Sequence, residues 1–169
     1  VLARISSLFC RRGFNIDSLT VSATNDPAVS RITVTLRGTE QALNQLILQT
    51  ERLEVTRQIF ELDPDKSLQR ELLLLKVACD AGNRAALREI SSIYKAKIID
   101  LSPDSMIFEL TGKPDKIDAF LAMLRDYDIL ELCRTGVTAL ERGGKHQHMQ
   151  KPAQEVGEAQ LPLPGTHCH

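Results

Sequence analysis

The order of secondary-structure signals repeats along this chain. In the second half, the hydrophobic patterns predict a strand at 72–78, a helix at 83–94, strands at 97–101 and 106–110, a helix at 114–124 and a strand at 129–134 that 137–140 could extend. The first half predicts the same order without an opening strand: a helix at 2–9, strands at 14–23 and 30–37, a helix from Thr39 to Leu53 and a strand at 55–62. A β-α-β-β-α-β unit folds as a four-stranded antiparallel sheet with two helices on one face. The repetition therefore predicts two tandem ferredoxin-like units.

Three segments carry this prediction most clearly. Residues 30–37 alternate strictly between polar and apolar side chains, which is typical of a half-buried strand. Residues 72–78 form a short continuous apolar run, which suits a central strand. In the helix that follows Pro114, apolar side chains recur at helical spacing: Ile117, Phe120, Leu121 and Leu124.

The chain is expected to be an α+β protein with two domains. Residues 63–67 are polar and contain Pro64, so we place a linker at 64–70 between a domain at 1–63 and a ferredoxin-like domain at 71–143. Residues 144–169 lack sustained periodicity and are predicted to be a disordered tail. Because halves of about 70 residues bury little surface, we expect an oligomer. We also expect the opening strand, and any targeting segment, to precede Val1.

Composition excludes several classes of protein. The 169 residues include 21 Lys and Arg against 22 Asp and Glu, a balance that argues against binding to nucleic acid or a membrane surface. No apolar run approaches the roughly 20 residues that span a bilayer. The four cysteines are far apart in sequence and are expected to be reduced: Cys10, Cys79, Cys133 and Cys168.

The predicted folded region lacks the residues of familiar catalytic sites. All four histidines lie in the predicted tail, so no histidine base, Ser-His-Asp triad or Cys-His pair is available before it. The sequence also contains no Gly-rich phosphate loop. Asp100 and Asp104 flank a turn and are interpreted as turn residues. A zinc site built from tail histidines and Cys168 is chemically possible, although adventitious binding is the favoured interpretation. The residues predict a protein that is not an enzyme.

Three polar segments remain to be explained. Residues 11–16 join a helix to a strand, and Asn15 either begins that strand or offers its amide to a ligand at a subunit interface. Residues 131–137 form a strand end with a polar break, which is interpreted as a bulge or turn. Residues 113–116 are interpreted as the start of a helix.

Five collinear segments resemble signatures of one family, the small regulatory subunits of acetohydroxyacid synthase (acetolactate synthase). The segment RGFNIDSLTV at 12–21 resembles the family's R-G-[YF]-N-I-[ED]-S-L-x-V. The other four are similar to family segments in the same order: SRIT at 30–33, RELLLLKV at 70–77, TG with KIDAF at 111–120, and RTGVTALERG at 134–143. The resemblance covers residues 1–143 and excludes the tail.

The resemblance implies an N-terminal ACT domain, here without its first strand, and a C-terminal ACT-like domain. It implies a homodimer with valine bound at the interface, and assigns effector binding to Asn15, Ile16 and Gly13. The family's remaining effector contacts lie in a loop that would precede Val1. Thiamine diphosphate, magnesium and FAD would belong to the catalytic subunit, so no cofactor and no metal site are expected in this chain.

The role implied is that of a non-catalytic subunit in the biosynthesis of valine, isoleucine and leucine. It would activate the catalytic subunit and confer feedback inhibition by valine, in the cytoplasm or, for a plant or alga, in a plastid. Two other hypotheses are kept. One is a free-standing ACT-type amino-acid sensor that regulates another enzyme, and the other is a small ferredoxin-like enzyme.

Overall fold

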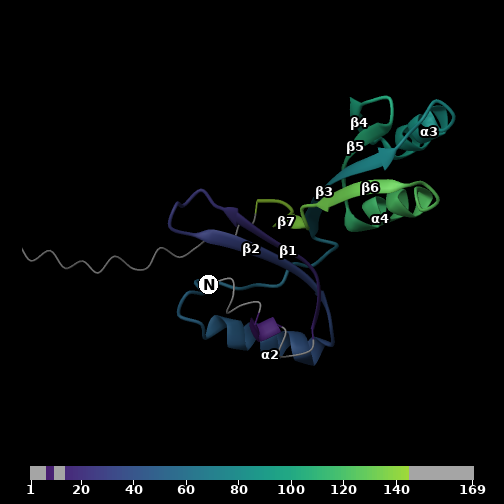
Figure 1. The fold of residues 1–169 in the computed structure, drawn as a ribbon. Helices are drawn as coiled ribbons and strands as arrows, with labels where there is room; N and C mark the ends of the chain where they lie inside the picture. The colour runs from purple at the N-terminus through teal and green to yellow at the C-terminus, as the bar shows by residue number, and fades with distance from the viewer. Residues whose placement is uncertain (1–6, 10–13, 145–169) are drawn as a thin grey trace, which may run out of the picture.

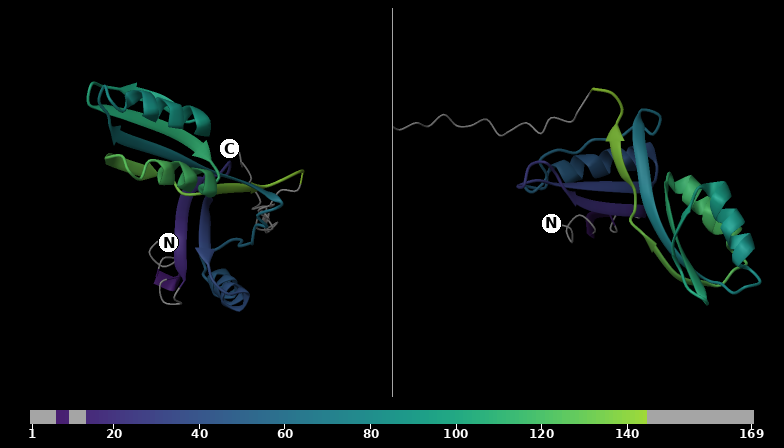
Figure 2. Two further views of the ribbon diagram at one scale, coloured as in Figure 1. Left: turned by 90° about the vertical axis from the view of Figure 1, so that its right-hand side faces the viewer. Right: turned by 90° about the horizontal axis from the view of Figure 1, so that it is seen from above.

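The computed structural model describes residues 7–9 and 14–144 of the chain. The expected helix at 2–9 therefore falls mostly outside the described residues, although residues 7–9 are helical. Gly13 and the expected tail beyond Gly144, with its histidines and Cys168, also lie outside them. Two groups of elements, joined by β3 and by the chain between β6 and β7, make up the described part (Figures 1 and 2).

The first group contains a two-stranded antiparallel sheet and a helix. The strands β1 (Asn15–Ala23) and β2 (Ser30–Arg37) pair with each other, and α2 (Glu40–Glu51) follows. Thr39 caps this helix as expected, because its Oγ1 accepts a hydrogen bond of 3.2 Å from the backbone N of Ala42. One face of the strand pair packs on Leu46 and Phe9 through apolar side chains that include Ile16, Ile32, Val34 and Leu36.

The second group is a complete β-α-β-β-α-β unit. Its elements in chain order are β3 (Ser67–Ala78), α3 (Arg84–Tyr94), β4 (Lys97–Leu101), β5 (Ser105–Gly112), α4 (Pro114–Met123) and β6 (Ile129–Arg134). The strand order is β4-β5-β3-β6, with all neighbours antiparallel. The unit predicted for the second half of the sequence is confirmed, including the central place of its first strand.

The core of this unit lies between the sheet and its two helices. Leu73, Leu75 and Val77 of β3 are fully buried, and Phe108 of β5 and Phe120 of α4 pack edge to face with ring centroids 5.9 Å apart. The opposite face of the sheet is less covered by described residues, since Leu74 is 38% exposed. The continuous apolar run of β3 thus places side chains on one buried face and one half-exposed face of the sheet.

β3 is longer than the sequence pattern predicts. It begins at Ser67, inside the segment 64–70 that was expected to be a linker, and its first four residues pair with β7 (Thr138–Glu141). β7 is a separate short strand rather than an extension of β6 within the sheet. Three of residues 67–70 are polar (Ser67, Gln69 and Arg70), so a search for hydrophobic periodicity does not detect this part of the strand. The domain boundaries themselves stay a prediction.

The predicted strand at 55–62 is wrong. These residues form turns and irregular backbone, and a cavity of about 750 Å³ separates them from β2 and α2. In a β-α-β-β-α-β unit, the opening strand would occupy the place of this cavity. There it would pair on one side with the third strand, here β2, and on the other with the fourth strand, predicted here at 55–62. Among the described residues, β2 has only β1 as a strand partner, so residues 55–62 have no neighbour with which to form a ladder.

This arrangement predicts a large difference in amide hydrogen exchange. Residues 32–36 of β2 are paired on one side, whereas residues 72–77 of β3 lie between β5 and β6. We expect amides of 32–36 to exchange faster by at least about a factor of ten, which corresponds to ~1.4 kcal/mol of opening free energy. Exchange followed by mass spectrometry measures this directly. Equal protection in the two strands would mean that another segment fills the cavity.

Candidate functional site

Asn15 begins β1, at the end of the strand pair next to Arg37. Its side chain is exposed and makes no hydrogen bond to any described residue. Ile16 is half-buried and packs in the cluster formed by α2 and the strand pair. Of the three residues predicted to bind an effector, Asn15 is thus exposed among the described residues, Ile16 packs against α2, and Gly13 lies outside the described residues.

A β-bulge follows directly after these two residues. The register of β1 against β2 shifts between Ile16 and Ser18, so Asp17 has no partner in the ladder. Asp17 instead forms an ion pair of 3.1 Å with Arg37, whose side chain is 84% exposed. Such an exposed pair contributes little stability. The bulge sets which β1 side chains beyond it face away from α2.

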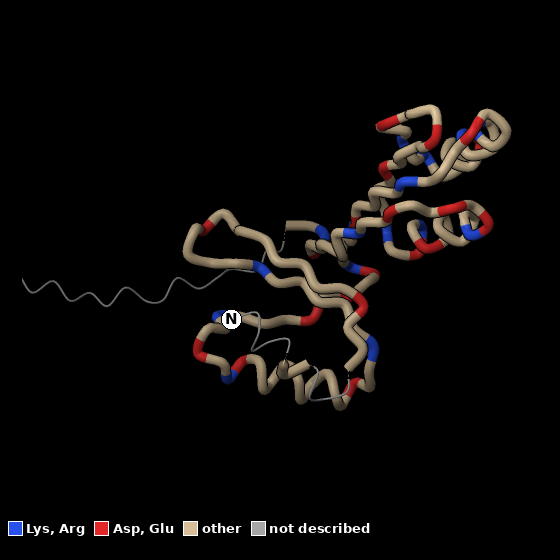
Figure 3. The backbone as a smooth tube through the Cα atoms, viewed as in Figure 1, with Lys and Arg blue, Asp and Glu red and all other residues tan. Residues whose placement is uncertain are grey.

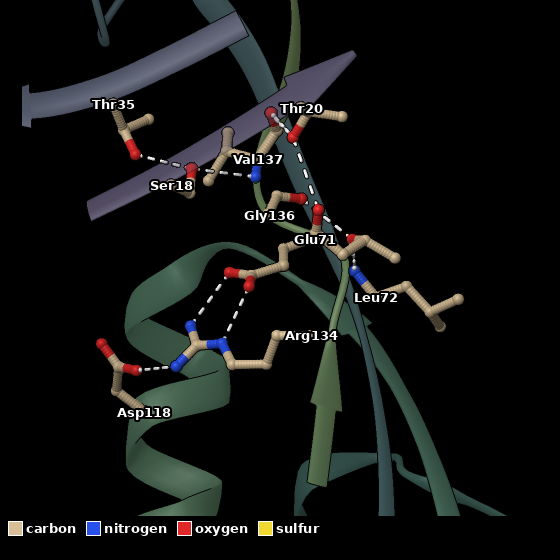
Figure 4. Close-up of polar contacts among 10 residues, drawn as sticks. Ser18, Thr20, Thr35, Glu71, Leu72, Asp118, Arg134, Gly136 and Val137 are labelled. Atoms are coloured by element: carbon tan, nitrogen blue, oxygen red, sulfur yellow. Dashed lines mark hydrogen bonds and ion pairs between the residues drawn. The ribbon is translucent and has the colours of Figure 1, made fainter. Parts of the chain in front are cut away.

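The face of the strand pair away from α2 is polar and contacts the C-terminal half. Ser18 Oγ accepts a hydrogen bond of 3.2 Å from the backbone N of Val137, and Thr20 Oγ1 donates one of 2.9 Å to the carbonyl oxygen of Val137 (Figure 4). Ser18 Oγ also lies 2.7 Å from Thr35 Oγ1. Two hydroxyl groups, two residues apart on β1, therefore hold both backbone polar groups of one buried residue.

Gly136 allows this close approach. Its φ is +85°, a conformation that side chains disfavour, and a Cβ there would lie 2.8 Å from Thr20 Oγ1 and 3.3 Å from Ser18 Cβ. One residue earlier, Thr135 makes two hydrogen bonds to Leu72 of β3, through its backbone N and its Oγ1, both at 3.1 Å. The segment is thus fixed to β3 while it passes over β1.

Arg134 anchors the start of this segment. Its guanidinium donates two hydrogen bonds, of 2.8 and 2.9 Å, to the buried carboxylate of Glu71 in β3, and a third, of 2.7 Å, to Asp118 in α4 (Figure 4). These hydrogen bonds, first of all those to Glu71, raise the pKa of Arg134, so it stays protonated throughout the range in which proteins are handled. Arg134 therefore joins β6, β3 and α4 directly before the segment that contacts β1.

Arg31 adds a further contact between the halves. Its Nη2 donates a hydrogen bond of 2.9 Å to the carbonyl oxygen of Ala139 in β7, and its guanidinium lies 5.6 Å from the ring centroid of Phe60. We call the contact of Ser18, Thr20 and Arg31 with residues 135–139 the junction. The sequence interpretation of residues 131–137 as a bulge or turn missed it, because the partners lie more than 100 positions away.

The described residues offer little other chemistry. Among residues 7–9 and 14–144, no three His, Cys, Asp or Glu side chains are grouped closely enough to hold a metal ion, and no helix is long and apolar enough to cross a membrane. Basic and acidic residues are interspersed over both groups of elements in Figure 3. The predicted start of a helix at 113–116 is confirmed, since Pro114 lies in the first turn of α4.

Two family models match this chain, and together they span both halves. Residues 1–58 match an acetohydroxyacid synthase small-subunit-like ACT domain, and residues 70–143 match the small subunit of acetolactate synthase. The chain belongs to the acetolactate synthase small-subunit family. The resemblance carried by its five sequence segments is therefore confirmed, and so is a fold of ferredoxin-like units with an N-terminal ACT domain.

Curated relatives of this small-subunit family cover nearly all of the matched region. The chain is 43% identical over 145 residues to the probable acetolactate synthase small subunit of Archaeoglobus fulgidus, covering 86% of this chain and 91% of that protein. It is 42% identical to the acetolactate synthase small subunit of Mycolicibacterium smegmatis, and the match covers 85% of this chain and 84% of that protein. It is 39% identical to the acetolactate synthase isozyme 3 small subunit of Salmonella typhimurium, and the match covers 85% of this chain and 89% of that protein.

A solved member of the family has the same architecture. The crystal structure of the acetolactate synthase small subunit from Thermotoga maritima superposes with a TM-score of 0.77 at 32% sequence identity. It covers 85% of this chain and 90% of that one. The family assignment therefore rests on sequence and on fold together.

Proposed function

We propose that this chain is the regulatory subunit of an acetolactate synthase, where it activates the catalytic subunit and confers feedback inhibition by valine. The observation that carries the proposal is the match of both halves to small-subunit family models in a single chain. An ACT domain alone would also suit a sensor that regulates another enzyme. The C-terminal match at 70–143 favours the synthase subunit.

The start of β1 supports an effector role. Asn15 has an exposed side chain, and its amide can both donate and accept hydrogen bonds, as recognition of the ammonium and carboxylate of a free amino acid requires. Valine offers both charges and a small branched side chain. Asn15, with Gly13 and Ile16 beside it, would form one side of the valine site at the interface of a homodimer.

The catalytic chemistry is assigned to the partner. Thiamine diphosphate, magnesium and FAD would be held by the large subunit, and this chain would bind none of them. The proposed setting is branched-chain amino-acid biosynthesis in the cytoplasm, or in a plastid if the source is a plant or alga.

Assembly distinguishes this function from the free-standing sensor. A regulatory subunit should co-elute with the large subunit of acetolactate synthase in size-exclusion chromatography of the mixed pure proteins. An unrelated thiamine-dependent enzyme of similar size is the control. Separate elution at micromolar concentrations, with or without valine, would favour the free-standing sensor instead.

Replacing Asn15 with Ala is expected to weaken valine inhibition and leave activation intact. Loss of a hydrogen bond to a charged group is worth about 1.5–3 kcal/mol, so the valine concentration for half-inhibition should rise about ten- to a hundred-fold. The measurement is a valine titration of the reconstituted enzyme. Asn44→Ala, on the exposed side of α2, is the matched control. A titration for Asn15→Ala that coincides with this control would refute the role of Asn15.

A further inference from the structure

The junction lies on the same strand as the proposed effector residue. Asn15 and Ser18 are separated by the β-bulge at Asp17, and Thr20 is two residues further along β1. A strand cannot shift at one end without moving the hydroxyl groups that project from it nearby. Binding at Asn15 is therefore placed to change the positions of the two hydroxyl groups that hold Val137.

The other side of the junction is tied firmly to the C-terminal half. Val137 and Ala139 are only 2% and 6% exposed. Thr135 is bonded twice to Leu72, and Arg134 is bonded to Glu71 and Asp118. Residues 134–137 therefore cannot follow a movement of β1 without disturbing β3 or α4, or else breaking their contact with β1.

The contact is sensitive to the position of β1 because β1 approaches the backbone of Gly136 closely. Thr20 Oγ1 lies only 2.8 Å from the position that a Cβ of residue 136 would take, so a small displacement of β1 toward the segment meets backbone rather than a flexible side chain. Contacts of this kind have two states, made or broken, and such elements carry coupling between sites.

We propose that the hydroxyl groups of Ser18 and Thr20, acting on Gly136–Val137, couple valine binding on β1 to the C-terminal half of the subunit. Ser18 and Thr20 are then positioning residues that transmit the effector signal without touching the effector. This inference rests on the proposed function and adds to it the route by which the two halves communicate. Couplings between sites typically change affinity by roughly 5- to 150-fold, a range that a few hydrogen bonds can supply.

Thr20→Val tests the proposal because it removes the hydroxyl and keeps the shape of the side chain. We expect this variant to bind valine within about twofold of the wild type in calorimetry of the small subunit alone. We expect it to lose at least half of the maximal inhibition by saturating valine in the reconstituted enzyme. Thr20→Ser, which keeps the hydroxyl, should restore inhibition.

Thr33→Val is the matched control. Thr33 lies opposite Thr20 in the register of the same sheet, and its hydroxyl bonds to no described residue. It should behave as the wild type. Normal inhibition in Thr20→Val, or a loss of inhibition matched by an equal loss of valine binding, would overturn the coupling. If valine does not inhibit the reconstituted wild-type enzyme, the proposed function is overturned, and the coupling with it.

Hydrogen exchange gives a second readout that needs no large subunit. Adding valine to the wild-type small subunit should change exchange at residues 67–72 and 135–139, and Thr20→Val should abolish that change while exchange near Asn15 still responds. A response in the C-terminal half that survives in Thr20→Val would show that the signal takes another route.

Discussion

Replacing Arg134 with Met is expected to lower the free energy of unfolding of the C-terminal unit by about 3 kcal/mol. Glu71 has a carboxylate whose side chain is only 4% exposed, and both of its oxygens are bonded to Arg134. Removing the guanidinium leaves a buried charge with no compensating partner. The expected cost is at the low end of the range for buried pairs because the Arg134 side chain is 29% exposed. Urea unfolding followed by circular dichroism measures the change.

Two companion variants identify the cause of this loss. Arg134→Lys keeps one charge but cannot form the fork to Glu71, so its stability should lie between those of the wild type and Arg134→Met. Arg134→Met combined with Glu71→Leu should recover most of the loss, because an apolar pair replaces a buried ion pair at little cost. A double variant as unstable as the sum of the two single variants would mean that packing, rather than charge, dominates at this position.

Replacing Phe120 with Ala is expected to cost about 3–5 kcal/mol. Phe120 of α4 is fully buried, and its ring lies 5.4 Å from that of Tyr94 and 5.9 Å from that of Phe108, measured between centroids. The substitution opens a cavity between both helices and the sheet. Because a domain of this size is stable by only ~5–15 kcal/mol, the melting temperature should fall by many degrees.

Met123→Ala is the control for this substitution. Met123 ends the same helix and is 53% exposed, so its truncation should change stability by less than about 1 kcal/mol. Thermal unfolding of the two variants side by side compares them. Equal melting temperatures for Phe120→Ala and Met123→Ala would contradict the packing described between α4 and the sheet.

The second half of the fold could be predicted from the sequence because each element is specified locally. The apolar run of β3 and the spacing of Ile117 and Phe120 in α4 each identify their element without reference to the rest of the chain. Residues 55–62 also contain strand-forming side chains, among them Val55, Ile59 and Phe60, yet they form no strand. A strand needs a neighbour to complete its hydrogen bonds, and that requirement is not local.

The candidate site was predictable only in part. Asn15 could be singled out because segment 12–21 resembles the family signature, whereas its residue chemistry alone also allowed a plain start of a strand. The junction could not, because Ser18 and Thr20 look like ordinary polar residues of a half-exposed strand. Their partner Val137 is more than 100 residues away, and only the folded chain brings its backbone to them.

The central claim is that this chain regulates an acetolactate synthase. The most direct test measures acetolactate formation by the matching large subunit alone, with a saturating amount of this chain, and with this chain plus valine. We predict that the chain raises the rate severalfold and that valine removes most of the increase, while valine has little effect on the large subunit alone. An unchanged rate on addition of the chain, with no response to valine in its presence, would contradict the account.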